Sequence, residues 1–227
     1  PNGRLGGLTA KRHLESTSST LKSTIDDMNA TLTESPFSQA SFEEFLDSRD
    51  EPAWLTDQRW QAWNAYCKMD WPTRREEEWI RTDTRLFKLD KYAFPSAQPN
   101  SAESPQGVLG EGVQLAGSSV SLDSRPVRSE IRAKWAGKGV LFGSLDLLIR
   151  EHGDLLRPHI QRQVVDPGYD RFAALHVACR AGGHVLYVPR GVVVDEPVHA
   201  VSALTDGGVD FGHTLVILEE GAEATFL

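Results

Sequence analysis

Two side chains that can bind metal ions lie three positions apart in the sequence, His176 and Cys179. In a helix this spacing places an imidazole and a thiol on the same face, where both could reach one metal ion. Two ligands complete a site only when others arrive from elsewhere in the fold. Helix packing is the simpler interpretation, because a buried cysteine behaves as a small apolar residue. A metal role for this pair is left open, and no metal ligand is predicted.

Three further histidines and an acidic cluster lie toward the end of the sequence. The histidines follow one another at intervals of 15 and 14 residues, and we expect each to be solvated or to make a single hydrogen bond. The acidic cluster surrounds a glycine, which indicates a solvent-facing turn rather than a cation site. The histidines are His184, His199 and His213, and the acidic residues are Glu219, Glu220 and Glu223.

The sequence contains none of the short motifs that carry catalytic or nucleotide-binding chemistry. Gly137-Lys138-Gly139 lacks the spacing of a phosphate-binding loop, and neither a dinucleotide-binding glycine pattern nor a serine nucleophile elbow occurs. Cys67 and Cys179 are far apart, so they cannot supply the four thiolates of an iron–sulfur cluster. We therefore predict that the chain is not an enzyme and that it has no catalytic, cofactor-binding or metal-binding residue.

The composition is that of an ordinary globular protein. Hydrophobic residues make up 40% of the 227, and the net charge of −8 argues against general nucleic-acid binding. No apolar run approaches the roughly 18–20 residues that span a bilayer. No secretory signal is evident, and two distant cysteines do not indicate a disulfide framework. These features together predict a cytoplasmic protein.

The two ends of the chain suggest a piece of a longer protein. Residues 1–34 are rich in serine and threonine and lack a core pattern, which indicates a disordered tail or a non-native extension. The chain stops at Leu227 within a strand pattern, and a bare final strand would leave an open core. We therefore expect the natural protein to continue beyond Leu227.

Residues 35–94 are predicted to form a helical N-terminal domain. Ser41 begins one helix as the first residue of a capping box, and a second helix is expected from Thr56 to Met69. An aromatic stripe on the second helix indicates a core face, with ligand binding as the less favoured reading. The stripe consists of Trp60, Trp63, Tyr66 and Cys67.

A segment rich in proline, serine and alanine, residues 95–118, is predicted to be a linker. Residues 119–183 should then hold short strands and helices that lead into the core. The expected elements are strands at Ser119–Leu122 and Gly139–Phe142, a helix capped by Ser144 that Gly153 interrupts or bends, and a helix over Arg171–Arg180 capped by Asp170.

Residues 184–227 consist of short apolar runs separated by Pro, Gly and Asp, which predicts strands. The sequence around Gly191 can be laid over that around Gly221, an offset of 30 residues. A repeat of this length without a helix suggests a parallel β-helix, and a sandwich or jelly roll is the alternative. The expected strands are Val185–Val188, Val192–Val194, Val198–Leu204, Leu215–Leu218 and Ala222–Leu227.

Several short sequence segments resemble those of the SufB/SufD family of iron–sulfur cluster assembly scaffold proteins. The segments at 171–176, 183–197 and 215–225 carry the resemblance. The segment Pro72-Thr-Arg-Arg-Glu-Glu-Glu-Trp79 is most like the SufD branch of the family. The resemblance covers roughly residues 37–227. One departure is His176, where the family usually has asparagine.

The resemblance implies an α+β fold in which a helical N-terminal domain is followed by the first coils of a right-handed parallel β-helix. It implies a non-catalytic SufD-like scaffold that associates with a SufB-like subunit through the β-helix. A SufC-like ATPase would bind beyond Leu227, and a homodimer is possible. Iron or an iron–sulfur cluster would enter only in the assembled complex. The alternatives are a SufB-type scaffold subunit and a carbohydrate-active enzyme built on a β-helix.

Overall fold

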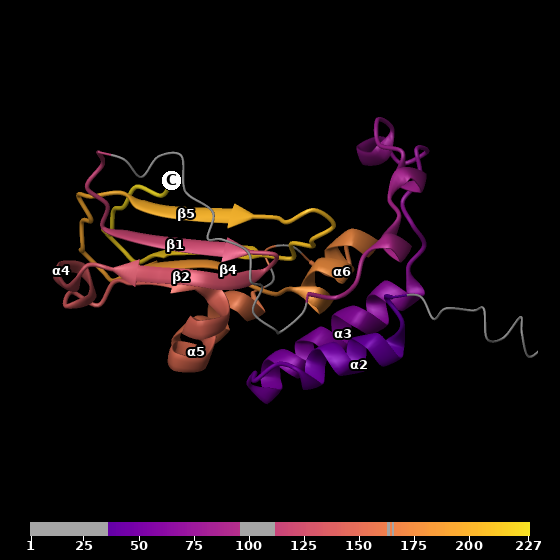
Figure 1. The fold of residues 1–227 in the computed structure, drawn as a ribbon, viewed down its shortest axis with the longest axis horizontal. Helices are drawn as coiled ribbons and strands as arrows, with labels where there is room; N and C mark the ends of the chain where they lie inside the picture. The colour runs from indigo at the N-terminus through magenta and orange to yellow at the C-terminus, as the bar shows by residue number, and fades with distance from the viewer. Residues whose placement is uncertain (1–35, 96–111, 163, 165) are drawn as a thin grey trace, which may run out of the picture.

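The computed structural model of this chain describes residues 36–95, 112–162, 164 and 166–227. The predicted tail at 1–34 and most of the predicted linker at 95–118 lie outside the described residues. The N-terminal helices and the last helix lie at one end of the molecule, and the two sheets lie at the other end with two further helices beside them (Figure 1). The described part is therefore a mixed α+β structure. No helix within these ranges is long and apolar enough to cross a membrane.

Three helices pack around one aromatic core at the helical end. They are α2 (Gln39–Asp47), α3 (Ala53–Lys68) and α6 (Arg171–Cys179). The rings of Phe42 and Trp63 stack at 4.4 Å between centroids, and Phe45 and Tyr66 are buried beside them. Leu175 of α6 closes the same cluster. The aromatic stripe of α3 is thus a core face, as its spacing predicts.

Two details of these helices differ from the sequence-based expectation. The cap of α2 is Ser38, whose hydroxyl accepts a hydrogen bond from the Ser41 amide at 3.2 Å, so the helix begins earlier than predicted. The sequence predicts Cys67 in the buried stripe, but its side chain is exposed. Successive side chains are rotated about the helix axis, so Cys67 points away from the core face on which Tyr66 lies. The final helix was predicted correctly, since the Asp170 carboxylate accepts from the Ala173 amide at 2.7 Å.

An irregular arm, residues 70–92, follows α3. It contains three short 3₁₀ helices, η1 (Glu77–Trp79), η2 (Thr84–Leu86) and η3 (Leu89–Lys91). Figure 1 shows this arm, in purple and magenta, projecting away from α2 and α3.

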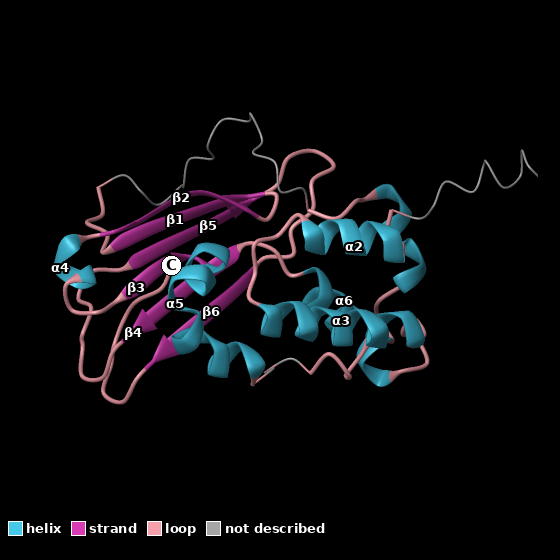
Figure 2. Cartoon of the chain, turned by 90° about the horizontal axis from the view of Figure 1, so that it is seen from below, coloured by secondary structure: helices cyan, strands magenta, loops and turns pink. Residues whose placement is uncertain are grey.

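The other end of the molecule is built from two three-stranded sheets (Figure 2). One sheet has the order β2-β1-β5 and the other the order β3-β4-β6, and each contains one antiparallel and one parallel pairing. The strands are β1 (Gly117–Leu122), β2 (Arg125–Ile131), β3 (Leu141–Ser144), β4 (Gly183–Val188), β5 (Val198–Ala203) and β6 (His213–Leu218).

The 30-residue repeat corresponds to a parallel stack in register. Gly183 pairs with His213 and Val188 with Leu218, so every partner along β4 and β6 is 30 positions away. The same offset continues at an isolated bridge between Val193 and Glu223. The pairing confirms the alignment that the sequence predicts.

Two other expected strands are not formed. Val192–Val194 and Ala222–Leu227 make only isolated bridges, because a turn at each glycine interrupts the ladder. Strand β2 was missed, since its residues are polar and mostly exposed and therefore lack an apolar pattern.

The sheets enclose one core and one of them packs on a helix. Leu186 of β4 and Val198 of β5 lie in the cluster between the sheets, which Trp135 of the short helix α4 (Ala133–Ala136) closes. Helix α5 (Leu145–Gln161) packs against the opposite face of the β3-β4-β6 sheet. Its backbone departs from helical geometry at His152, next to the predicted bend at Gly153.

Candidate functional site

His176 and Cys179 both lie on α6, and their side chains have different surroundings. Cys179 is fully buried in the helical core. His176 instead meets His213, the first residue of β6, with Nε2 3.2 Å from Nδ1. No sequence pattern indicates this contact, because the two histidines belong to different elements. Among the described residues no group of three or more His, Cys, Asp or Glu side chains is placed to hold a metal ion.

The surroundings of the two histidines favour their neutral forms. Burial, the nearby charge of Arg180 and the His176 ring together lower the pKa of His213 to about 4. Burial and Arg180 also lower the pKa of His176, although Asp210 opposes this. At neutral pH one ring donates its N–H to the other ring, so the contact is a hydrogen bond between neutral imidazoles.

This histidine pair should make the folded state sensitive to acid. The pKa of His213 is about 4 in the folded chain and 6.5 in the unfolded chain, so the unfolded chain binds more protons between these values. Stability should therefore fall as the pH drops from about 7 to about 4.5, with His213 accounting for about 2 kcal/mol. Urea unfolding of the wild type and a His213→Gln variant across this range tests it. The wild type should lose more stability, and parallel pH profiles would contradict the prediction.

A second buried histidine, His184, lies between the two sheets. Its Nδ1 is 2.9 Å from the Ser119 hydroxyl of β1, and its Nε2 is 3.2 Å from the Ser202 hydroxyl of β5. The expectation of a solvated or singly bonded ring is therefore wrong for His184. His199 is also buried. Burial lowers the pKa of His184, which keeps the ring neutral as a polar bridge within the core.

A cluster of charged side chains joins the helices to the sheets. Arg59 of α3 is almost fully buried and binds Glu51 through two hydrogen bonds of 2.7 and 2.8 Å. Its third nitrogen donates to the carbonyl of Ala178 in α6 at 3.0 Å. Arg49 binds Glu51 and also Asp146 of α5, the latter at 2.9 Å. Glu51 thus accepts from two arginines.

One carboxylate of the cluster, that of Asp146, also binds the backbone. Asp146 accepts a hydrogen bond from the amide of Gly182, directly before β4, at 2.9 Å. Burial alone would raise the pKa of Glu51, but Arg59 and Arg49 hold it below its ordinary value. Arg180 lies nearby with a pKa lowered to about 10 by burial and by Arg59. Its Nη2 atom is buried and has no hydrogen-bond partner within the described ranges.

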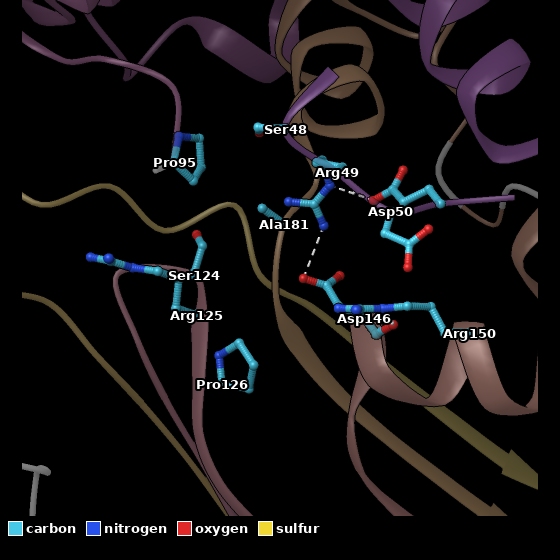
Figure 3. Close-up of a pocket in the computed structure, with 11 residues that line it drawn as sticks. Ser48, Arg49, Asp50, Pro95, Ser124, Arg125, Pro126, Asp146, Arg150 and Ala181 are labelled. Carbon is cyan, nitrogen blue, oxygen red and sulfur yellow. Dashed lines mark hydrogen bonds and ion pairs between the residues drawn. The ribbon is translucent and has the colours of Figure 1, made fainter. Parts of the chain in front are cut away.

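The cluster lines a cavity of about 350 Å³ (Figure 3). The figure shows Arg49 between the chain after α2 and Asp146 of α5, with the β1–β2 turn across the opening. Three arginines and three carboxylates line it, so its walls carry no net charge. This balance selects neither an anion nor a cation. The charged lining residues are Arg49, Arg125, Arg150, Asp50, Glu51 and Asp146.

Within the described ranges, no strand pairs with the side of β6 that faces away from β4. Leu186 and Val188 in β4 are 0% exposed, whereas their in-register partners Val216 and Leu218 in β6 are 46% and 47% exposed. Both strands have the same apolar pattern, but only β4 has a neighbouring strand on each side, β3 and β6. An exposed apolar layer of this kind is typical of a surface that stacks against another strand.

Two of the acidic residues after β6, Glu220 and Glu223, are exposed, and Glu219 is half-buried. Glu220 pairs with Arg190 of the preceding turn at 2.8 Å, and both side chains are about three-quarters exposed. This pair therefore contributes little to stability. It lies beside the stacked turns at Gly191 and Gly221, where the Gly191 amide donates to the Glu220 carbonyl at 3.0 Å.

In the part of the chain that the structure describes, a helical core and stacked strands are joined by buried polar contacts. Residues 40–200, more than half of the chain, match the family described as the SufBD protein N-terminal region. The chain belongs to the SufBD family.

Curated relatives carry the corresponding names. The iron–sulfur cluster assembly protein SufB of Bacillus subtilis is 27% identical over 208 residues, covering 82% of this chain and 42% of the relative. An iron–sulfur cluster assembly SufBD family protein of Staphylococcus haemolyticus is 28% identical over 199 residues, covering 81% and 42%. Another from Staphylococcus aureus is 26% identical over 217 residues, covering 89% and 45%. The chain thus spans less than half the length of these relatives.

Proposed function

We propose that this chain is part of a SufD-like scaffold subunit that supports iron–sulfur cluster assembly by association and not by catalysis. The observation that carries the proposal is the open stack, in which β6 repeats β4 in register while its own apolar layer stays exposed. Such a stack leaves an apolar surface available for contact with another strand or subunit. The iron–sulfur cluster is the cargo of this process.

The open stack also supports a specific architecture. We infer that β4, β5, β6 and the bridges after Gly221 are the first coils of a right-handed parallel β-helix. A further coil would cover Val216 and Leu218 in the way that β6 covers β4. The relatives are more than twice as long as the matched region, which leaves room for such coils. The completed β-helix would then present the surface that pairs with a SufB-like subunit.

The proposal is tested by co-expressing the full-length protein with the SufB-like and SufC-like proteins of the same genome. We expect the protein to elute with both partners as one complex in size-exclusion chromatography. The SufC-like ATPase would supply nucleotide hydrolysis, since the sequence here contains no phosphate-binding loop. Elution of the protein without either partner would contradict the proposal.

A SufB-type subunit is the second candidate, and the name of the Bacillus subtilis relative favours it. The resemblance at Pro72–Trp79 favours SufD instead. The two are distinguished by replacing each cysteine beyond Leu227 in the full-length protein. A cysteine that the complex requires for cluster assembly would identify a SufB-type subunit, whereas a SufD-like subunit should tolerate every replacement.

A further inference from the structure

Strand β2 is the outermost strand of its sheet, and its residues 126–130 are all exposed (Figure 2). Within the described ranges no strand pairs with its outer edge. An edge of this kind presents peptide N–H and C=O groups that can pair with a further strand. The stack continues on the opposite side of the same sheet, where Val198 of β5 bridges to Phe226. The edge of β2 is therefore the other end of the stack.

The peptide groups that are available for pairing belong to alternate residues of β2. The Arg132 amide donates to the carbonyl of Ala116, directly before β1, at 2.9 Å, which fixes the phase of the ladder. Bonded pairs in an antiparallel ladder recur at every second residue, so the peptide groups of Glu130 and Arg128 face β1. The peptide group of Ser129, between them, therefore points outward.

Two opposite charges flank Ser129 on one face of β2. Arg128 pairs with Val120 of β1 and Glu130 with Ser118, and all four residues line one groove on the outer face of the sheet. The Arg128 and Glu130 side chains are 56% and 66% exposed, with Nε of the first 3.6 Å from Oε1 of the second. An exposed contact of this length is weak, so both charges can engage a partner.

A second copy of the chain fits this edge when the two β2 strands run antiparallel about a two-fold axis at Ser129. In that register Arg128 of each copy faces Glu130 of the other, so both cross-strand pairs attract. A register centred on Arg128 or on Glu130 would instead place like charges opposite each other, which is destabilising. The two charges therefore favour this register over its neighbours, and they cancel within it although the whole chain carries −8.

We propose that β2 mediates a symmetric dimer of this chain, in which the β2-β1-β5 sheets of two copies join edge to edge into one continuous sheet. The inference does not rest on the proposed function. The dimer would form at the end of the stack away from the exposed Val216 and Leu218, so a further coil or another subunit could still bind there.

Charge reversal in the full-length protein tests this contact, with self-association measured by sedimentation velocity over a range of concentrations. Arg128→Glu and Glu130→Arg should each weaken self-association about tenfold, since each creates two cross-strand pairs of like charge. The double variant, Arg128→Glu with Glu130→Arg, restores both attractions and should associate within about threefold of the wild type. The control Arg81→Glu makes the same change of charge at an exposed residue outside the sheets, and it should alter self-association by less than about twofold.

A mixture of the two single variants gives the sharpest test. Fluorescently labelled Arg128→Glu protein should form a heterodimer with unlabelled Glu130→Arg protein at close to wild-type affinity, because every cross-strand pair is again of opposite charge. A wild type that stays monomeric, or a dimer that both reversals leave within about twofold, would overturn the proposal. Reversals that weaken only the binding of the SufB-like subunit would show that this subunit occupies the edge, which also overturns it. Co-elution with the SufB-like and SufC-like proteins tests the proposed function separately, so the two can fail independently.

Discussion

Replacing Glu51 with glutamine should lower the free energy of unfolding by about 3 kcal/mol or more. The carboxylate is the shared acceptor of Arg49 and Arg59, and Arg59 is only 1% exposed. Without the negative charge, two buried guanidinium groups and the neighbouring Arg180 face each other with Asp146 as the remaining carboxylate. Urea unfolding followed by tryptophan fluorescence measures the loss.

The matched control is Glu43→Gln on α2, where the carboxylate is exposed and accepts a hydrogen bond from Gln39 at 2.9 Å. This change should stay within about 0.5 kcal/mol. The pKa of Glu51 in the folded chain lies below its ordinary 4.5, so its contribution is present at neutral pH and is lost as the pH falls through the folded pKa. The gap between wild type and Glu51→Gln should therefore narrow in acid. Equal losses for the two variants at neutral pH would rule out a special role for Glu51.

A methyl group at Gly183 should disrupt the start of the stack. This glycine has φ of +95°, a conformation that residues with a side chain rarely adopt. A Cβ there would also collide with the backbone nitrogen and oxygen of His213, and backbone atoms cannot rotate away. We expect Gly183→Ala to cost about 3 kcal/mol or more, from the strained φ together with the forced separation of β4 and β6.

Gly191→Ala provides the comparison for the Gly183 variant. Gly191 also has a positive φ, +68°, but a Cβ there would have no atom within 4 Å. Its replacement should therefore cost only about 1 kcal/mol, the price of the backbone conformation alone. Comparing the melting temperatures of the two variants separates the cost of the steric collision at Gly183 from the cost of the positive φ, which both variants share. Similar melting temperatures would mean that β6 shifts to accommodate the methyl group.

The elements that sequence patterns predict well are those with strong local signals. The cap at Asp170 defines the last helix, and the paired glycines Gly191 and Gly221 define the repeat that becomes the β4–β6 register. Strand β2 lacks such a signal because the packing of the sheets, and not its own apolar residues, keeps it in place. The cap of α2 was misplaced by three residues, since Ser38 and Ser41 both have capping chemistry.

The side-chain contacts that join the helices to the sheets could not be predicted from local sequence patterns. Nothing in the sequence near Arg59 indicates that a charged residue is buried, because its partner Glu51 and the carbonyl of Ala178 come from other elements. The same holds for His176 and His213, which are 37 positions apart. Patterns with a short period report which face of an element is apolar, but a polar contact across elements depends on how those elements are packed.

The packing of α6 against α2 and α3 bears on the order in which the chain acquires structure. Arg59 and Ala178 are 119 positions apart and meet in the same core. During synthesis the two N-terminal helices emerge long before α6, with their aromatic faces still without a partner. Closing that core means closing a loop that contains β1, β2, β3 and α5, which slows the search relative to a local helical bundle. The helical end of this protein is therefore completed late, after the strands that separate its helices in the sequence have been made.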